Sequence, residues 1–135
     1  MTRYRRIAPA ELGAPSGFSH GLLADQGGRM LFVAGQTATG PDGSVVGGGL
    51  AEQFGVALDR VLAVVRAAGG APESVGGMTV FVTDMGAYRA ARRELGGVWR
   101  DRMGDHYPAM ALVAVTELVD EGALLEIEAT AMIWK

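Results

Sequence analysis

Near its C-terminus the chain reads Tyr107-Pro-Ala-Met-Ala-Leu-Val-Ala-Val115 and then, after an acidic segment that contains Gly122, Ala123-Leu-Leu-Glu-Ile-Glu-Ala-Thr-Ala-Met-Ile-Trp134. Two apolar runs joined by a short polar segment with a glycine are typical of an antiparallel pair of strands. Glu126 and Glu128 are two residues apart, so both carboxylates should lie on one face of the sheet. Two charges in so apolar a strand indicate either a solvated face or a carboxylate that works in a pocket.

Three short strands are expected upstream. Residues 1–17 begin with basic residues and continue through prolines and glycines, as in a short strand followed by a loop. Apolar runs at 18–24 and 30–33 flank the segment Asp25-Gln26-Gly27-Gly28, so we expect these two runs to form a hairpin. Residues 38–49 contain five glycines and are expected to form a loop.

Hydrophobic spacing predicts two helices. Residues 50–68 carry an apolar face, and most polar side chains of this helix, Gln53 included, should lie off that face. A strand is expected at 78–83, and Asp84 is suited to cap a second helix at 85–103. The apolar stripes are Phe54, Leu58, Val61, Leu62 and Val65 in the first helix, and Tyr88, Ala91, Leu95 and Trp99 in the second.

The expected element order is therefore β-β-β-α-β-α-β-β, an α+β fold with a mixed sheet. Each helix connects two strands, and such crossovers are nearly always right-handed and leave the strands parallel. Two helices cover only one face of a sheet, yet residues 110–115 are apolar at every position, as in a strand buried on both sides. We therefore expect the uncovered face to pack against another copy of the chain.

Composition predicts one soluble domain over residues 1–135, with 49% hydrophobic and 20% charged residues. The absence of cysteine excludes disulfides, thiolate metal sites and a cysteine nucleophile. A net charge of −3 opposes nucleic-acid binding. The sequence shows no signal-peptide pattern and no membrane-spanning run, so we expect a cytoplasmic protein without a membrane partner. His20 and His106 have no partner at metal-ligand spacing, so no metal and no cofactor are expected.

Several segments carry a resemblance to a known family. They are Gly17-Phe-Ser-His20, Phe32-Val-Ala-Gly-Gln36, Met78-Thr-Val-Phe-Val-Thr-Asp-Met85, Pro108-Ala109 and Leu125-Glu-Ile-Glu-Ala129. Together they resemble the Rid family of reactive-intermediate (imine/enamine) deaminases, also called L-PSP endoribonuclease-like or perchloric-acid-soluble proteins. The resemblance implies a chorismate-mutase-like fold and a homotrimer that binds small molecules in clefts between neighbouring subunits.

The resemblance also implies a set of site residues. In the family's deaminases a glutamate and a backbone carbonyl position the attacking water, and these correspond to Glu126 and Gly35. The arginine that grips the substrate carboxylate in those enzymes corresponds to Met110, because this chain has Pro-Ala-Met where the family has Pro-Ala-Arg. The other positions implied to face the ligand are Phe18, Ala34, Leu112 and, on the second helix, Arg92.

Each assignment has a structural alternative. Glu126 is either a general acid/base or a surface glutamate, and Met110 either contacts ligand or fills the core. Arg92 either replaces the missing cation or belongs to a basic helix face with Arg89 and Arg93. Two functions follow: an enzyme acting on an imine, enamine or related electrophile that lacks the usual carboxylate handle, or a non-catalytic ligand-binding or partner-binding trimer that has lost deaminase activity.

Overall fold

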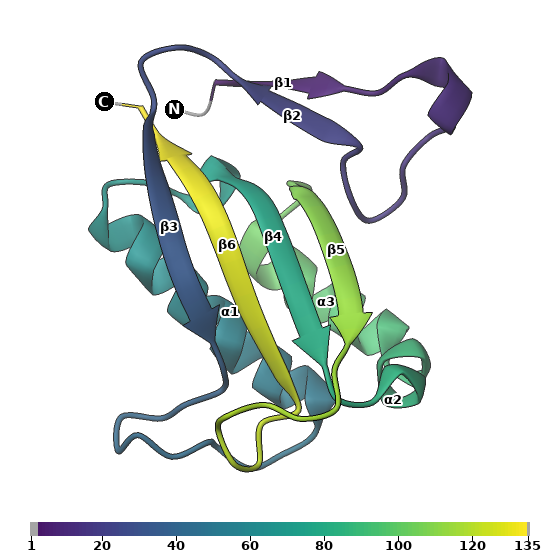
Figure 1. Cartoon of the computed structure of the whole chain (residues 1–135), viewed down its shortest axis with the longest axis vertical. Helices are drawn as coiled ribbons and strands as arrows, with labels where there is room; N and C mark the ends of the chain where they lie inside the picture. Colours follow the sequence, from purple (N-terminus) through teal and green to yellow (C-terminus); the bar gives the residue numbers. More distant parts are fainter. Residues whose placement is uncertain (1–2, 135) are drawn as a thin grey trace.

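The computed structural model describes residues 3–134, and its main body is a sheet with helices on one face (Figure 1). The elements follow in the order β1 (Tyr4–Ile7), η1 (Ala10–Leu12), β2 (Gly21–Ala24), β3 (Arg29–Gln36), α1 (Leu50–Ala67), η2 (Pro72–Ser74), β4 (Val75–Val82), α2 (Met85–Ala90), α3 (Arg92–Met103), β5 (Ala109–Ala114) and β6 (Leu125–Ile133).

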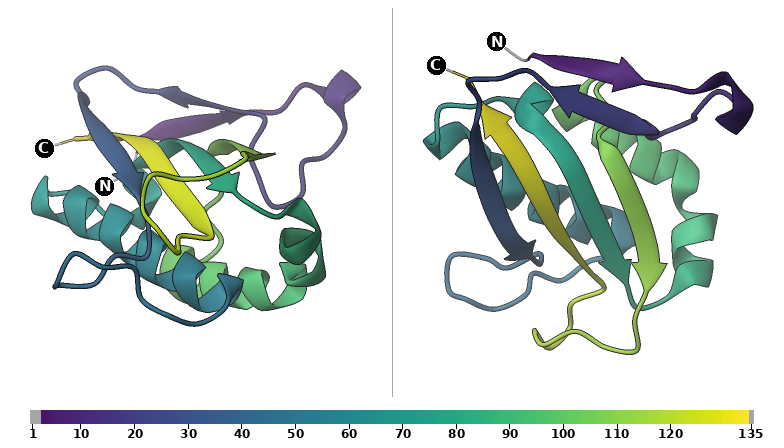
Figure 2. Two further views of the ribbon diagram at one scale, coloured as in Figure 1. Left: turned by 60° about the horizontal axis from the view of Figure 1, so that its bottom comes forward. Right: turned by 45° about the horizontal axis from the view of Figure 1, so that its top comes forward.

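The main sheet has four strands in the order β3-β6-β4-β5. Strand β6 is antiparallel to both of its neighbours, whereas β4 and β5 are parallel. The helices α1 and α3 lie behind this sheet in Figure 1, and the two views of Figure 2 show them on the same side. The expected mixed sheet with helices on one face is confirmed. No helix of residues 3–134 covers the other face, which is called the open face below.

Strand β2 is not the partner of β3, so the expected hairpin at 18–33 is wrong. Instead β2 pairs with β1 in a separate two-stranded antiparallel sheet that lies across one end of the main sheet (Figure 2). The pair Gly27-Gly28 suggested a hairpin turn, but packing explains Gly28. A Cβ at this position would lie 2.9 Å from the side chains of Met132 and Trp134. The glycine therefore permits close packing on the end of β6, and Gly27, with φ +89°, makes the turn before it.

The two C-terminal runs are strands, but they are not a hairpin pair, which corrects the second expected pairing. Strand β4 lies between β5 and β6 and bonds to both of them. The acidic segment after β5 therefore crosses the end of β4 before the chain returns in β6 (Figure 1). This placement makes β5 an edge strand of the main sheet.

The core lies between the helices and one face of the sheet. The predicted stripe of α1 is buried, with Leu58, Val61, Leu62 and Val65 fully inaccessible to solvent. On β6 the residues at 125, 127, 129, 131 and 133 are buried, and those between them are more exposed. This alternation places Glu126 and Glu128 together on the open face, as expected.

Gln53 of α1 is buried, which corrects the expectation that it lies off the apolar face. Its side chain accepts a hydrogen bond from the Leu124 N–H (2.9 Å) and donates to the carbonyl oxygens of Gly122 (3.1 Å) and Val46 (3.4 Å). A buried amide is stable only when such partners are present. Gln53 therefore fixes the chain immediately before β6 begins.

The second helical segment is two helices. Asp84 caps α2 as expected, accepting a hydrogen bond from the Ala87 N–H at 3.0 Å. A turn at Ala91 separates α2 from α3, so the continuous helix expected at 85–103 is wrong. Strand β4 is longer than expected, because it begins at Val75 directly after η2.

The open face carries apolar side chains that remain exposed in a single chain. Phe32 is 76% exposed, Met30 58% and Val113 42%. Val113 belongs to the run 110–115, whose apolar residues at every position led us to expect burial on both sides of β5. The open face therefore combines exposed apolar side chains with the two glutamates of β6.

Candidate functional site

Glu126 lies against the backbone of Gly35 on the open face. A Cβ placed on Gly35 would lie 2.8 Å from Cδ of Glu126 and 3.1 Å from its Cγ, so a larger residue at position 35 would displace the carboxylate from this position. Gly35 does not have a positive φ, which means that contact with Glu126, and not the backbone conformation, favours glycine at this position. Glu126 is half-buried and makes no hydrogen bond or ion pair with any other residue in 3–134.

A bulge in β3 presents Gly35 to this carboxylate. Val33 pairs with Ala129 and Gln36 pairs with Ile127, so Ala34 and Gly35 together oppose Glu128 alone. A bulge takes residues out of the regular ladder, re-aims the strand, and is common beside active sites. Ala34 and the backbone of Gly35 are therefore exposed next to Glu126.

Polar contacts from α1 hold the end of β3 in place. Arg60 donates through Nε to the side-chain oxygen of Gln36 (3.0 Å) and through Nη1 to the carbonyl oxygen of Thr39 (3.0 Å). The Thr37 hydroxyl donates to the carboxylate of Asp120, which lies in the segment before β6. These bonds connect the chain after Gly35 to the segment before Glu126, so they fix the two groups relative to each other.

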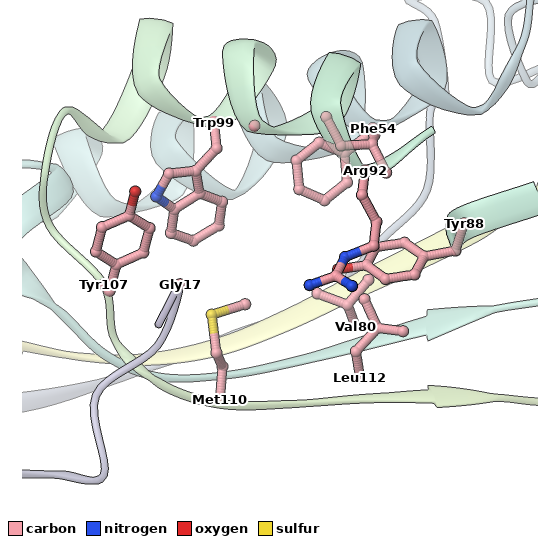
Figure 3. Close-up of a pocket in the computed structure, with 11 residues that line it drawn as sticks. Gly17, Phe54, Val80, Tyr88, Arg92, Trp99, Tyr107, Met110 and Leu112 are labelled. Atoms are coloured by element: carbon pink, nitrogen blue, oxygen red, sulfur yellow. The ribbon is translucent and has the colours of Figure 1, made fainter. Parts of the chain in front are cut away.

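A pocket of about 190 Å³ lies on the other side of the sheet, between β4, β5 and the helices (Figure 3). It is mainly apolar and aromatic, and among residues 3–134 Arg92 is its one charged lining residue. The lining residues are Gly17, Phe54, Val80, Tyr88, Arg92, Leu95, Gly96, Trp99, Tyr107, Met110 and Leu112.

Met110 and Leu112 reach this pocket because of the register of β5. Met110 pairs with Met78 and Leu112 with Val80 across the parallel ladder, and Met78 and Val80 belong to the buried core. Paired residues of neighbouring strands point to the same face. Met110 and Leu112 therefore point toward the helices and away from the open face.

The loop before β2 closes the pocket near Met110. The Ser19 N–H donates to the Pro108 carbonyl oxygen at 3.0 Å, and the Ser19 hydroxyl donates to the Tyr107 carbonyl oxygen. These bonds hold Gly17 at the pocket and bring Phe18 to the same region of the molecule. The Phe18 ring packs edge-on against His20 and is 37% exposed.

The expected site residues thus form two groups on opposite faces of one sheet. Glu126, Gly35 and Ala34 lie on the open face, whereas Met110, Leu112 and Arg92 line the pocket beneath it, with Phe18 near the pocket. One chain cannot bring the two groups together. The roles of these residues remain predictions.

Sequence reasoning missed the aromatic wall of the pocket. Trp99 stacks on Tyr107 with ring centroids 5.9 Å apart and an angle of 5°, and Phe54 lies 6.4 Å from Trp99. The Trp99 indole N–H donates to the His106 carbonyl oxygen at 3.2 Å, which fixes the ring. Apolar spacing predicts only a helix stripe that contains Tyr88 and Trp99, and the structure shows that both side chains line the pocket.

Other kinds of site are not evident in residues 3–134. No group of three or more His, Asp or Glu side chains in this part of the chain could hold a metal ion. No helix there is both long enough and apolar enough to span a membrane.

Comparison with known proteins agrees with the resemblance in the sequence. The model of the family described as endoribonuclease L-PSP matches residues 9–133. A RutC family protein of Pyrococcus horikoshii is 32% identical over 109 residues, which cover 80% of this chain and 82% of that protein. A rat protein named 2-iminobutanoate/2-iminopropanoate deaminase is 31% identical over 126 residues, covering 93% of this chain and 84% of the relative.

A solved structure supports the fold. The crystal structure of YyfB from Yersinia pestis, described as a protein of unknown function in the conserved Rid protein family, superposes with a TM-score of 0.84. The two proteins are 31% identical, and the match covers 97% of this chain and 99% of that one. The expected α+β, chorismate-mutase-like fold is confirmed.

Proposed function

The chain belongs to the endoribonuclease L-PSP family, which includes the Rid proteins, and from this premise we propose that it is a Rid-type small-molecule enzyme. The proposed substrate is a reactive imine, enamine or related electrophile, and the proposed site is a cleft between copies of a homotrimer. The observation that carries the proposal is the Glu126 carboxylate held against Gly35 at a bulge on the open face.

The placement of the two residue groups supports a cleft shared between copies. Glu126 and Gly35 lie on the open face, while the pocket with Met110 and Leu112 lies beside the edge strand β5 on the helix side. The open face also carries exposed apolar residues such as Phe32. Packing the open face of one copy against the β5 edge of the next would cover Phe32 and bring Glu126 to a neighbour's pocket.

In this cleft Glu126 acts as general acid/base. Water adds to the carbon of the C=N bond, with the Gly35 carbonyl accepting a hydrogen bond from it, and the carboxylate takes the released proton. The same carboxyl delivers this proton to nitrogen, which gives a carbinolamine. It then transfers the hydroxyl proton to the amine nitrogen, so that the C–N bond breaks as the C=O bond forms, and ammonia and a carbonyl compound leave. A positioned carboxyl of this kind contributes a factor of about 10² to 10⁴ to the rate.

Met110 argues against the small 2-imino acids named for the rat relative. A thioether is a weak hydrogen-bond acceptor and cannot grip a carboxylate as a guanidinium does in a bidentate pair. Imino acids of three or four carbons have little else to hold them. We therefore propose that those generated from serine or threonine are turned over barely above the uncatalysed rate.

A non-catalytic ligand-binding or partner-binding trimer is the second candidate. The pocket favours it, because its apolar and aromatic lining with Met110 suits ligand binding without any reaction. The two candidates differ in what they require of Glu126, since only the enzyme needs a carboxyl group that accepts and donates a proton.

Glu126→Gln, with Glu128→Gln as its matched control, decides between the candidates. Both residues lie on the open face of β6. The assay generates imines in solution from primary amines with an amine oxidase, and from larger amino acids with an amino-acid oxidase, and traps the surviving imine with semicarbazide. We expect Glu126→Gln to abolish the protein's effect on trapping and Glu128→Gln to preserve it. Equal activity in all three proteins would exclude the catalytic role.

A further inference from the structure

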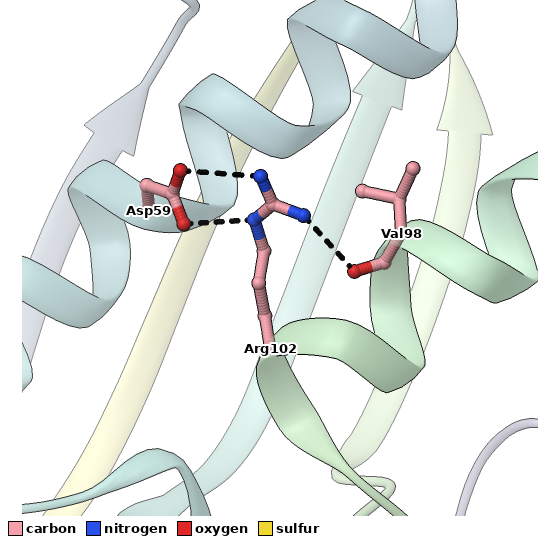
Figure 4. A network of polar contacts seen from close by, with 3 residues as sticks. All are labelled: Asp59, Val98 and Arg102. Carbon is pink, nitrogen blue, oxygen red and sulfur yellow. Dashed lines mark hydrogen bonds and ion pairs between the residues drawn. The ribbon is translucent and has the colours of Figure 1, made fainter.

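The arginines of α3 differ in what they bind. Arg102 is engaged by the fold: it forms a two-pronged ion pair with Asp59 of α1, at 2.7 and 3.3 Å, and donates to the Val98 carbonyl oxygen at 3.3 Å (Figure 4). Arg92 makes no hydrogen bond or ion pair with any residue in 3–134. Its guanidinium extends from the helix toward the space above Met110 and Leu112 (Figure 3).

Of the three neighbouring arginines Arg89, Arg92 and Arg93, Arg92 is the one that lines the pocket. Arg89 and Arg93 are exposed nearby, but neither lines it. If Arg92 belonged only to a solvated basic surface with Arg89 and Arg93, its position at an apolar cavity would have no explanation. An unengaged guanidinium at the mouth of such a cavity offers up to five N–H donors to an anion.

The body of the pocket selects for an apolar group. Its aromatic wall is fixed by the Trp99–Tyr107 stack and the Trp99 indole hydrogen bond. On the helix side, Gly96 has no side chain to occupy the pocket, and a Cβ at this position would have only the side chain of Arg100 within 4 Å. An apolar cavity of roughly 150 Å³ is enough to hold benzene, and this pocket has about 190 Å³. It therefore has room for one aromatic ring or a branched aliphatic chain.

We infer that the pocket binds a monoanion with an aromatic or branched apolar body, with the anionic group on Arg92 and the body between Met110, Leu112 and Trp99. This inference rests on the proposed function for the role of the cleft and specifies its substrate class. It differs from a simple restoration of the missing arginine. The cation is Arg92 of α3, whereas the missing arginine would lie on β5. Because the apolar side chain of Met110 lies beneath Arg92, the carboxylate must be attached to a group large enough to fill the apolar part of the pocket.

The test uses three probes: 3-phenylpropanoate, its neutral amide 3-phenylpropanamide, and propanoate, which lacks the ring. Binding to the intact protein is measured by calorimetry. We expect 3-phenylpropanoate to bind best. Arg92→Gln should weaken it about tenfold, as expected when a charge-assisted hydrogen bond is lost, and should leave the amide unchanged. Arg93→Gln, on the same helix, is the matched control and should change neither.

Several outcomes would overturn the inference: no binding of any probe, equal binding of the acid and the amide, propanoate binding as well as the ringed acid, or no effect of Arg92→Gln. Arg92→Lys, which keeps the charge and loses the fork, should lie between the wild type and Arg92→Gln. These are binding measurements, so they are independent of turnover. If the acid binds through Arg92 but Glu126→Gln leaves imine turnover unchanged, the anion site stands and the proposed catalytic role fails.

Discussion

Gly35→Ala tests the contact between the bulge and the candidate carboxylate. The added Cβ would lie 2.8 Å from Glu126 Cδ, closer than carbon atoms approach without a bond, so one of the two groups must move. Glu126 is the end of a flexible side chain on the open face and can turn away. Turning to an unfavourable rotamer costs about 0.5–1.5 kcal/mol, which corresponds to a fall in melting temperature of roughly 2–6 °C for a chain of this size.

The effect on the reaction should be far larger than the effect on stability. A general base must lie within hydrogen-bond reach of the water that it activates, so displacing the Glu126 carboxylate should remove most of its contribution, a factor of about 10² or more. The imine-trapping assay measures this loss, and thermal unfolding measures the stability. Full activity in Gly35→Ala would show that the chemistry does not depend on the carboxylate held at this glycine.

A double-mutant cycle separates this contact from a general effect of alanine at position 35. In the Glu126→Ala background the space above Gly35 is vacant, so Gly35→Ala should cost no stability there. The coupling between the two positions should equal the cost of Gly35→Ala alone, about 1 kcal/mol. A coupling of zero would mean that the Glu126 carboxylate does not lie on Gly35 in solution.

Two further predictions concern the pocket and the assembly. Gly96→Ala and Gly97→Ala should each stabilise α3 by up to about 1 kcal/mol. Only Gly96→Ala should weaken binding of 3-phenylpropanoate, because Gly96 lines the pocket and Gly97 does not. Equal binding by both variants would contradict the assignment of Gly96 to the pocket wall. Phe32→Asp places a charge on the open face, so light scattering should show a monomer for this variant. Val119→Asp, at a fully exposed loop position, should remain a trimer. A wild-type monomer at micromolar concentration would contradict the shared cleft.

Most elements could be predicted because their signals are local. The apolar spacing of α1 and the capping position of Asp84 depend on neighbours a few residues away, and both are confirmed. Strand partners depend on distant segments. The glycine pair at 27–28 resembles a hairpin turn, but Gly28 is there because Trp134, more than a hundred residues away, packs on it. Nothing local reveals that β4 inserts between β5 and β6.

The candidate site was predicted unevenly for a similar reason. The alternation of charged and apolar residues in β6 was enough to place Glu126 and Glu128 on one face. Residues 110–115 are apolar at every position, so alternation gave no indication of the face that Met110 takes. Only the register with Met78 in β4 shows that it points toward the helices. The separation of Glu126 from Met110 by the sheet was therefore inaccessible from sequence.

The shared cleft is the central claim, and mixed trimers test it most directly. One copy carries Glu126→Gln, and the other carries Gly96→Leu, which fills the pocket from a helix position where an added Cβ has only the Arg100 side chain within 4 Å. Each variant alone should be inactive in the imine-trapping assay. The two variants are then co-expressed in equal amounts and assemble at random. If the carboxylate and the pocket of one site come from different copies, each is intact with a probability of one half, so about one quarter of the sites are complete. We predict recovery to about that fraction of wild-type turnover, and mixed trimers with no recovered turnover would contradict the account.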